Sequence, residues 1–447
     1  MNRKIFELFK DHDIFLVGGA ARDRLLNLEI NDYDYATSAL PEVTLDILQK
    51  AGYTPYTVGI AFGTVGFIDK DIKYEITTYR KDENYQRDNR NPTVEWGKTI
   101  EEDLKRRDFT INCLAIFETD EGIHSITDPY NGIKHLKEKV LDTPIDANQT
   151  FSEDPLRILR ACRIKSKLGF QYSEQVKEAL HNQAARLLIL PRERIVDEMN
   201  KILMLDNVKE ALMDLFEYRL INYFIPELVA LKSIEQESKF HHKNALLHTI
   251  DVVHNSPKDI LMRWSSLFHD IGKQATFSSK DGVVHFYEHD SVGALMTYSI
   301  LLRLGLPKQM VKDVTYLVRN HMRANTYSLE WSDSSIRRFI KDTGDYCSAL
   351  LSLSRADVTS HNPITVAKHL DNLNDLARRI EEQRNFKESP TCPVDGYAIM
   401  KHFDLPPCKK VAEIKALILE AIISGELSMG LEEDVMLRFV ERKIDNK

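Results

Sequence analysis

The sequence predicts an α+β head followed by an all-helical body. Short apolar runs alternate with helix-like segments over about the first 140 residues. Beyond about residue 150, apolar residues recur with the helical period of 3.6 almost throughout. At 447 residues the chain is too long for one hydrophobic core. We therefore expect four domains, at 1–140, 141–235, 236–365 and 366–447.

The composition is that of an ordinary globular protein, with 43% hydrophobic and 29% charged residues. No apolar run reaches the roughly 18 residues that span a bilayer, so we expect neither a membrane segment nor a signal peptide. Five scattered cysteines form no CxxC pair, which predicts reduced thiols and a cytoplasmic location. The net charge of −8 averages over domains, so local positive clusters decide whether nucleic acid binds.

Residues 14–37 combine a phosphate cradle with a metal site. An apolar strand at 14–17 leads to Gly18 and Gly19 at a helix start, where free N–H groups and the helix dipole suit a triphosphate. Asp32 and Asp34 follow in a second strand and share a face, because strand residues two apart point the same way. Paired carboxylates suit Mg²⁺. A nucleotidyltransferase needs this arrangement.

The rest of the head is predicted as a helix at 41–51 and strands near 53–58, 64–68 and 73–78. The polar, charged segment at 79–98 predicts a mobile, solvent-exposed loop. After it, Arg106 and Arg107 suit phosphate oxygens, while Asp108 and Asn112 suit ribose hydroxyls. An apolar strand at 113–117 follows. A solvated charge run is the alternative interpretation of 103–112.

A helix predicted at 153–168 places Asp154, Arg157 and Arg160 on one face. A surface ion pair is the common interpretation of such a spacing. A carboxylate beside a guanidinium can also pair with the Watson–Crick edge of adenine or cytosine, whereas guanine and uracil would leave groups unpaired. The basic residues of this helix form a patch suited to phosphates. They are Arg157, Arg160, Arg163, Lys165 and Lys167.

Six motifs in order over about 200 residues resemble the class II tRNA nucleotidyltransferase and poly(A) polymerase family. They are GGAARD (18–23) with DYDYAT (32–37), the segment after Tyr79, RRDFTIN (106–112), DPYNG (128–132), EDPLRILRACR (153–163) and LPRERI (190–195). The resemblance implies a polymerase-β-like head followed by a helical neck, body and tail. It implies nucleotide-selecting and RNA-binding helices in the neck.

The resemblance also implies roles for individual residues. Asp32 and Asp34 would bind two catalytic Mg²⁺ ions, with Glu75 as a further carboxylate. Gly18, Gly19 and Arg22 would hold the triphosphate, Asp108 and Asn112 the ribose, and Glu153, Asp154 and Arg157 the base. The full nucleotide-binding set is Gly18, Gly19, Arg22, Arg107, Asp108, Asn112, Glu153, Asp154, Arg157 and Arg160.

The segment at 79–98 bears on which base is added. Members of the family that add only CC typically have a shortened loop here. The segment is long in this chain, so we expect that the enzyme can add AMP. Addition of CCA, of the terminal A alone, or of a poly(A) tail all remain open.

A second set of candidate metal ligands lies in the body. A lone histidine is more often a core or surface residue, but here His269 and Asp270 end an apolar helix at 261–268 and the other ligands sit on separate predicted helices. Their wide spacing excludes a zinc finger. Imidazoles mixed with carboxylates suit a mono- or dinuclear site that activates water against phosphate esters. The set is His248, His269, Asp270, His289, His321 and Asp357, with His285 as a further candidate.

Residues 240–360 resemble an HD-type phosphohydrolase domain through LLHTIDVV, LFHDIGK, HFYEHDSVGA, RNHM and RADV. We expect Mn, Ni, Fe or a similar divalent transition metal there, or Mg²⁺. Phosphate esters at RNA ends, such as 2′,3′-cyclic phosphates, are the expected substrates. The tail is predicted to be helical, with a break at 392–405 before two short helices.

The leading hypothesis is a template-independent nucleotidyltransferase that acts on tRNA or another RNA 3′ end. It would use ATP and CTP and would have no membrane partner. One alternative is a poly(A) polymerase with the same head. Another is chiefly an HD-type hydrolase whose head only binds RNA.

Overall fold

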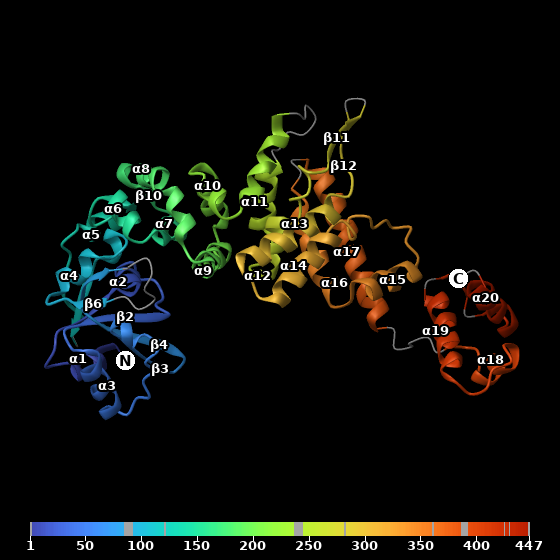
Figure 1. Ribbon diagram of the computed structural model, residues 1–447, viewed down its shortest axis with the longest axis horizontal. Helices are drawn as coiled ribbons and strands as arrows, with labels where there is room; N and C mark the ends of the chain where they lie inside the picture. Colours follow the sequence, from blue (N-terminus) through green and yellow to red (C-terminus); the bar gives the residue numbers. More distant parts are fainter. Residues whose placement is uncertain are drawn as a thin grey trace. The chain divides into compact units, whose positions relative to one another are not determined.

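The computed structural model describes residues 2–84, 93–119, 122–236, 245–280, 283–359, 362–385, 392–423, 425–428 and 430–445. The chain forms two compact units, Met1–Phe224 and Ile225–Lys447. Figure 1 draws unit 1 in blue to green and unit 2 in yellow-green to red. A mixed sheet lies in unit 1 and unit 2 is mainly helical, so the predicted fold class is confirmed. The division into four domains stays a prediction.

Unit 1 contains a six-stranded sheet of order β3-β4-β2-β1-β7-β8, followed by helices. Its elements are α1 (Asn2–Leu8), β1 (Ile14–Val17), α2 (Gly18–Leu25), β2 (Asp32–Thr37), α3 (Pro41–Lys50), β3 (Thr64–Asp69), β4 (Ile72–Thr78), β5 (Arg80–Asn84), β6 (Thr93–Trp96), α4 (Ile100–Lys105), β7 (Ala115–Thr119), β8 (Gly122–Thr127), α5 (Gly132–Glu138), β9 (Val140–Leu141), α6 (Ala147–Glu153), α7 (Leu156–Leu168), β10 (Gln171–Tyr172), α8 (Glu174–Asn182), α9 (Arg192–Leu203) and α10 (Val208–Glu217).

The alternation of side chains along β2 separates core from site. Tyr35 is buried and meets the ring of Phe6 on α1 edge-on at 5.7 Å. Tyr33 stacks on Tyr74 of β4, with ring centroids 5.2 Å apart. Because strand residues alternate between faces, these aromatic rings anchor one face while Asp32 and Asp34 occupy the other. The core under the sheet therefore fixes the direction of the two acids.

Several local expectations for unit 1 were wrong. The segment 53–58 forms no strand; only Tyr56 makes an isolated bridge, to Gly66 of β3. The segment 79–98, predicted as a loop, instead contains two strands, β5 and β6, which pair antiparallel. We call this pair the β5–β6 hairpin. Residues 85–92 of the predicted loop lie outside the described residues.

The helix predicted at 153–168 is broken. α6 ends at Glu153, Asp154 has extended backbone angles (φ −135°, ψ 99°), and α7 begins at Leu156. Pro155 explains the break, because its ring disfavours helical angles in the residue before it. Asp154 and Arg157 are therefore not one turn apart on a single continuous helix.

The described residues of unit 2 form helices and one antiparallel pair of strands, β11 and β12. Its elements are α11 (Ala245–Asn255), α12 (Ile260–Phe268), β11 (Phe277–Lys280), β12 (Val283–Phe286), α13 (His289–Leu304), α14 (Lys308–Asn320), α15 (Asp333–Thr343), α16 (Cys347–Asp357), α17 (Pro363–Asn385), α18 (Gly396–His402), α19 (Lys409–Ile423) and α20 (Glu433–Asp445). One apolar cluster joins α11, α12, α14 and α16, including Val252, Met262, Leu317 and Leu350.

The end of the chain also differs from expectation. The predicted break at 392–405 contains α18, which packs with α19 and α20 around buried residues such as Ile399, Ile418 and Val440. The tail thus has its own apolar core. Within the described ranges, no helix is both long and apolar enough to cross a membrane.

Candidate active site and a second metal-ligand cluster

Three carboxylates lie on neighbouring strands of unit 1. Asp32 and Asp34 share a face of β2, and Asp34 is paired with Glu75 across the parallel β2–β4 ladder. Burial raises the pKa of Asp34 to about 6, and Glu75 and Asp32 add to this, while Arg107 opposes it. A hard cation relieves such crowding of negative charge, so the donor set fits Mg²⁺. Lys73 forms an ion pair with Glu75 at 2.7 Å.

Because Gly18 has no side chain, Arg107 can lie close to these carboxylates. Gly18 has a φ of +65°, which residues other than glycine rarely adopt. A Cβ there would lie 3.0 Å from Arg107 Nη1 and 3.8 Å from Asp34 Oδ2. The predicted phosphate cradle, Arg107 and the carboxylates therefore meet at the start of α2.

The predicted ribose residues belong to a buried network. The Asn112 amide donates to Asp108 Oδ1 at 2.9 Å, and Asn112 Oδ1 accepts from Arg22 Nη1 at 2.8 Å. Arg160 donates twice to Asp108 Oδ2. Burial alone would raise the pKa of Asp108, but Arg160 and Asn112 hold it far below the usual range. Four of the predicted residues, Arg22, Asp108, Asn112 and Arg160, are thus linked by hydrogen bonds.

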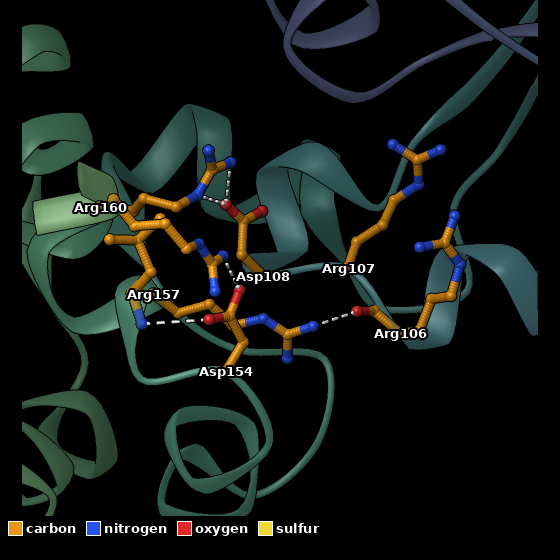
Figure 2. A pocket seen from close by; sticks show the side chains of 8 residues that line it. Arg106, Arg107, Asp108, Asp154, Arg157 and Arg160 are labelled. Atoms are coloured by element: carbon orange, nitrogen blue, oxygen red, sulfur yellow. Dashed lines mark hydrogen bonds and ion pairs between the residues drawn. The ribbon is translucent and has the colours of Figure 1, made fainter. Parts of the chain in front are cut away.

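A cavity of about 220 Å³ opens beside this network. Figure 2 shows Arg160 directed toward the Asp108 carboxylate and Arg157 directed toward the main chain of Arg106. Five guanidinium groups against two carboxylates give the wall a positive balance suited to phosphates. The lining residues are Arg106, Arg107, Asp108, Asp154, Leu156, Arg157, Arg160 and Arg194.

Asp154 and Arg157 both line the cavity, but other groups hold them. Asp154 Oδ2 accepts from Arg194 Nη2 at 3.1 Å, and its Oδ1 accepts from the Leu156 N–H at 3.2 Å. Arg157 donates to the carbonyl oxygens of Arg106 and Thr150. Asp154 and Arg157, the pair predicted to read the base, therefore line the same cavity. Among the described residues, the hydrogen bonds of the two side chains are made to other residues and not to each other.

The basic residues of α7 do not form a free phosphate patch, contrary to expectation. Arg163 is paired with the buried Glu198, Lys165 with Asp214 at 3.3 Å, and Lys167 with Asp23 at 3.7 Å. Arg157 lies 3.6 Å from Glu153. The sequence hid this neutralisation because most of the acidic partners come from distant segments. Glu153 itself lies outside the cavity lining and accepts from Gln149 at 2.9 Å.

Two residues of the site had no predicted role. Arg194 belongs to the LPRERI motif, which was noticed without assigning a function to the arginine. Asp103 is fully buried and binds both Arg106 and Arg107. Arg106 and Arg107 follow Asp103 by three and four residues, which is the spacing of neighbours on a helix. This spacing could have predicted the two contacts.

The six metal-ligand candidates of unit 2 converge on one cluster. His248, His269 and Asp357 offer ligand atoms within 4.8 Å of one another, and so do Asp270, His289 and His321. Asp270 joins the two groups, because its Oδ2 lies 3.2 Å from His269 Nε2 and its Oδ1 lies 3.7 Å from His289 Nε2. The arrangement is that of two cation positions with a shared carboxylate.

Hydrogen bonds on the far side of each imidazole set its orientation. Nδ1 of His269, His289 and His321 donates to the carbonyl oxygen of Ser266, Phe286 and Val318, respectively, at 2.6–2.9 Å. His248 Nδ1 lies 2.7 Å from Thr359 Oγ1. A donating Nδ1 leaves the lone pair of Nε2 free, and this is the usual state of a metal-bound histidine.

The Nε2 atoms themselves show why a cation fits. Those of His248 and His269 lie 3.2 Å apart, as do those of His289 and His321. Burial would lower the pKa of His269, but Asp270 and Asp357 raise it to about 10. Two converging lone pairs repel unless a proton or a metal lies between them. The donor chemistry therefore fits divalent transition metals.

A close backbone contact brings α13 to the cluster. A Cβ on Gly272 would lie 2.1 Å from the carbonyl oxygen of His289, so only glycine fits there. His285, the further candidate, is not in either ligand group; it lies on β12 and stacks on Tyr287 at 5.0 Å. His285 therefore lies outside the ligand cluster, four residues before His289.

Comparison with known protein families gives three matches along the chain. Residues 14–142 match the Poly A polymerase head domain, 169–231 match the probable RNA- and SrmB-binding site of polymerase A, and 242–362 match the HD domain.

Individual relatives agree with these matches. A CCA-adding enzyme of Anoxybacillus flavithermus is 40% identical over 221 residues, which cover 49% of this chain and 53% of that relative. The chain thus matches about half the length of that protein. An A-adding tRNA nucleotidyltransferase of Deinococcus radiodurans is 29% identical over 436 residues, covering 93% of both. The structure of a Bacillus stearothermophilus CCA-adding enzyme in complex with CTP has the same fold, with a TM-score of 0.64, 24% identity, and coverage of 100% of this chain and 97% of that one.

The relatives named as a CCA-adding enzyme and an A-adding tRNA nucleotidyltransferase support the predicted class of enzyme, an RNA nucleotidyltransferase. The matched head, RNA-binding and HD regions follow the order of the motifs that resemble the tRNA nucleotidyltransferase and poly(A) polymerase family. The roles assigned above to single residues stay predictions.

Proposed function

We propose that this protein is a template-independent tRNA 3′-end nucleotidyltransferase that adds CCA, or the terminal A, from CTP and ATP. The observation that carries the proposal is the joining of two half-sites by Arg107. This side chain lines the cavity that contains Asp154 and Arg157, and its Nη1 lies beside Gly18 and Asp34. A nucleotide whose base occupies the cavity would extend its phosphates toward the carboxylates. The relatives that add CCA or A support the proposal.

Base choice rests on Asp154 and Arg157. The Asp154 carboxylate accepts hydrogen bonds and the Arg157 guanidinium donates them, which matches the exocyclic amine and ring nitrogen of adenine and cytosine. Guanine and uracil would leave these groups unpaired, at the full cost of a buried polar group without a partner. The contact with Arg194 and the carbonyl of Arg106 hold the two side chains in place before the nucleotide arrives.

Asp32, Asp34 and Glu75 are the residues that would hold divalent metal ions. Bound Mg²⁺ would supply activation of the primer 3′ hydroxyl and stabilisation of the leaving pyrophosphate. The chain's own contribution is to orient the triphosphate through Gly18, Gly19 and Arg107. The long segment at 79–98 supports AMP addition.

Primer extension tests this proposal. The protein would be incubated with one tRNA that ends before CCA and another that ends in CC, each with CTP alone, ATP alone or both. We expect addition of A to the CC-ended tRNA, and addition of CC to the shorter one if the full CCA is made. Long A tails on either tRNA without CMP incorporation would identify a poly(A) polymerase. No incorporation at all would refute a nucleotidyltransferase role.

A second activity is proposed for the cluster in unit 2, hydrolysis of phosphate esters at RNA ends. The shared carboxylate of Asp270 between two imidazole groups supports it, because paired cations can activate water and bind a phosphate together. The test is hydrolysis of an RNA with a 2′,3′-cyclic phosphate in Mn²⁺, Ni²⁺ or Mg²⁺. An intact cyclic phosphate under all three metals would refute the activity.

A further inference from the structure

A row of residues crosses the sheet of unit 1 at the level of Asp34. Directly paired residues of neighbouring strands point to the same face of a sheet. Asp34 of β2 is paired with Glu75 of β4, and Glu75 is paired with Gly66 of β3. The ring of Tyr56 fills the space that a side chain at Gly66 would need, because a Cβ there would lie 2.2 Å from Tyr56 Cζ. The row therefore runs from the acids to a tyrosine ring at the β3 edge of the sheet.

Tyr56 is fixed in this place by its own hydrogen bonds. Its backbone N–H donates to the Gly66 carbonyl oxygen at 2.7 Å, and its hydroxyl donates to Glu75 Oε1 at 3.4 Å. Lys73 lies on the same face, paired with Asp32, and its Nζ is 2.7 Å from the same Oε1. The Lys73 side chain is 46% exposed, and an ion pair this open to water adds little stability. An aromatic ring and an accessible ammonium group thus border the acids.

The two sides of the carboxylates carry different groups. The strand order β3-β4-β2-β1 places Gly18, which directly follows β1, on one side of Asp34. Arg107 lies beside Gly18, so this is the side of the proposed triphosphate contacts. Lys73 and Tyr56 lie on the other side, on β4 and against β3.

The chemistry of nucleotide transfer assigns these two sides. The reaction is an in-line displacement, in which the attacking 3′ oxygen and the leaving pyrophosphate lie on opposite sides of the α-phosphorus. A pyrophosphate on the side of Gly18 therefore requires the primer end to approach from the side of β3 and β4.

We propose that Lys73 and Tyr56 hold the 3′-terminal nucleotide of the RNA primer, with the Lys73 ammonium on its phosphate and the Tyr56 ring against its base. The proposal rests on the nucleotide-transfer function above and deepens it by assigning the primer side of the same site. A cation beside an aromatic face binds single-stranded RNA without reading its sequence. Such tolerance suits a primer whose last base changes as nucleotides are added.

Steady-state kinetics with a CC-ended tRNA separates primer contacts from nucleotide contacts. Tyr56→Leu should raise the KM for tRNA by about 10-fold, because a stacked base is lost. Lys73→Gln should raise it by about 5-fold, and the slope of log KM against log salt concentration should fall by about 0.7, the share of one phosphate on a single strand. The KM for ATP should not change in either variant.

Lys70→Asn is the matched control for the loss of charge. Lys70 is exposed at the β3–β4 turn, and asparagine tolerates its φ of 51°. This variant should leave the KM for tRNA and its salt dependence unchanged, as should the wild-type charge pattern predict if the effect belongs to Lys73 alone.

A role confined to Glu75 predicts another pattern. If Lys73 only orients or neutralises Glu75, Lys73→Gln lowers kcat and leaves the KM for tRNA and its salt slope unchanged. That result overturns the proposal. If Tyr56→Leu fails to fold, Lys73→Gln decides, because its side chain is exposed and its loss opens no cavity.

Photocrosslinking locates the primer end without catalysis. A tRNA ending in CC would carry iodocytidine as its last nucleotide, which ultraviolet light joins to an aromatic side chain in contact with it. Mass spectrometry should find the crosslink at Tyr56 in the wild type, and Tyr56→Leu should lose it. A crosslink at another residue, kept in Tyr56→Leu, overturns the proposal. If the wild type incorporates no nucleotide, the proposed function fails, whereas nucleotide addition with an unchanged KM for tRNA in both variants refutes only the primer contacts.

Discussion

The two candidate metal sites differ in how closely the protein alone brings their ligand atoms together. One site consists of the carboxylates of β2 and β4, and the other is the histidine and aspartate cluster of unit 2. In unit 2, a hydrogen bond at Nδ1 fixes the orientation of each imidazole. Within each of the two ligand groups the ligand atoms lie within 4.8 Å of one another, and the Asp270 carboxylate joins the two groups. In unit 1, Glu75 is paired with Lys73, and Asp34 faces Arg107. Among the described residues, both compact ligand groups belong to unit 2.

The difference suits the two chemistries. A cluster of imidazoles binds a transition metal before any substrate arrives. Carboxylates suit Mg²⁺, which keeps several waters and is normally shared with substrate phosphates. We therefore expect unit 2 to hold its metal in the free protein and unit 1 to gain its metal with the nucleotide.

The largest expected effect is at the carboxylates of unit 1. Asp34→Asn should lower nucleotide addition by about 10³-fold or more, because a lost ligand removes charge stabilisation that the transition state requires. Cyclic-phosphate hydrolysis should be unaffected. Asp71→Asn is the matched control, since Asp71 is exposed at the β3–β4 turn and its φ of 65° is tolerated by asparagine. Full addition by Asp34→Asn would show that Asp34 is not a ligand of the catalytic metals.

The shared carboxylate of unit 2 comes next. Asp270→Asn should weaken metal binding at both positions by about 100-fold, since even changes behind a ligand cost 10–100-fold. Metal content of the purified protein, measured by atomic emission, should fall while nucleotide addition stays within about twofold. Glu330→Gln, an exposed change in the same unit, should keep the wild-type metal content. Retention of all metal by Asp270→Asn would contradict the assignment.

Base choice should respond to the cavity wall. Asp154→Asn replaces an acceptor by a group that also donates, so discrimination of ATP and CTP against GTP and UTP should fall by about 10²-fold. The ratio of kcat/KM values for the four nucleotides measures this. Glu174→Gln, at an exposed position at the start of α8, should leave the ratio unchanged. Equal discrimination in Asp154→Asn would place base reading elsewhere.

Low pH should reduce the free energy of unfolding of unit 1, because the Asp103 carboxylate becomes protonated. Burial would raise the pKa of this carboxyl, but Arg107 and Arg106 lower it to about 2, against an ordinary 3.8. A lowered carboxyl pKa stabilises the folded state above pH 3.8 and loses that effect as the pH falls toward 2. The contribution at neutral pH is about 2 kcal/mol.

Urea unfolding followed by Trp96 emission checks this. The other tryptophans, Trp264 and Trp331, lie in unit 2 and are removed by subtracting a Trp96→Phe blank. The wild type should lose its advantage over Asp103→Asn as the pH falls from 5 toward 2. A constant difference across that range would show that the ion pairs contribute nothing dependent on pH.

The smallest effect concerns the outer contact of His248. Thr359→Val keeps the side-chain shape but removes the hydroxyl beside Nδ1. Metal affinity should fall by about 10-fold, at the low end of such changes. Titration with a competing chelator measures it, and Thr365→Val on α17 provides a comparison. Unchanged affinity would mean that this hydroxyl does not orient the imidazole.

Local patterns predicted much of the fold and the site. The alternation along β2 sufficed to place Asp32 and Asp34 on one face, and the period of the body predicted its helices. The six ligands of unit 2 were found because each sits at or near a helix end in a recognisable motif. Such features depend on neighbours in the sequence.

What the sequence did not reveal depends on distant partners. The basic residues of α7 are neutralised by acids such as Glu198 and Asp214, from other helices. Arg194 reaches Asp154 across 40 residues. The break at Pro155 was visible locally, but the apolar period on both sides of it predicted one continuous helix.

Nucleotide selection without a template tests the central claim most directly. The wild-type protein would be given a tRNA ending in CC and each of the four ribonucleoside triphosphates separately. We predict addition of a single A from ATP, and no addition from GTP or UTP above about 1% of that rate. Comparable incorporation of all four nucleotides would contradict selection by Asp154 and Arg157.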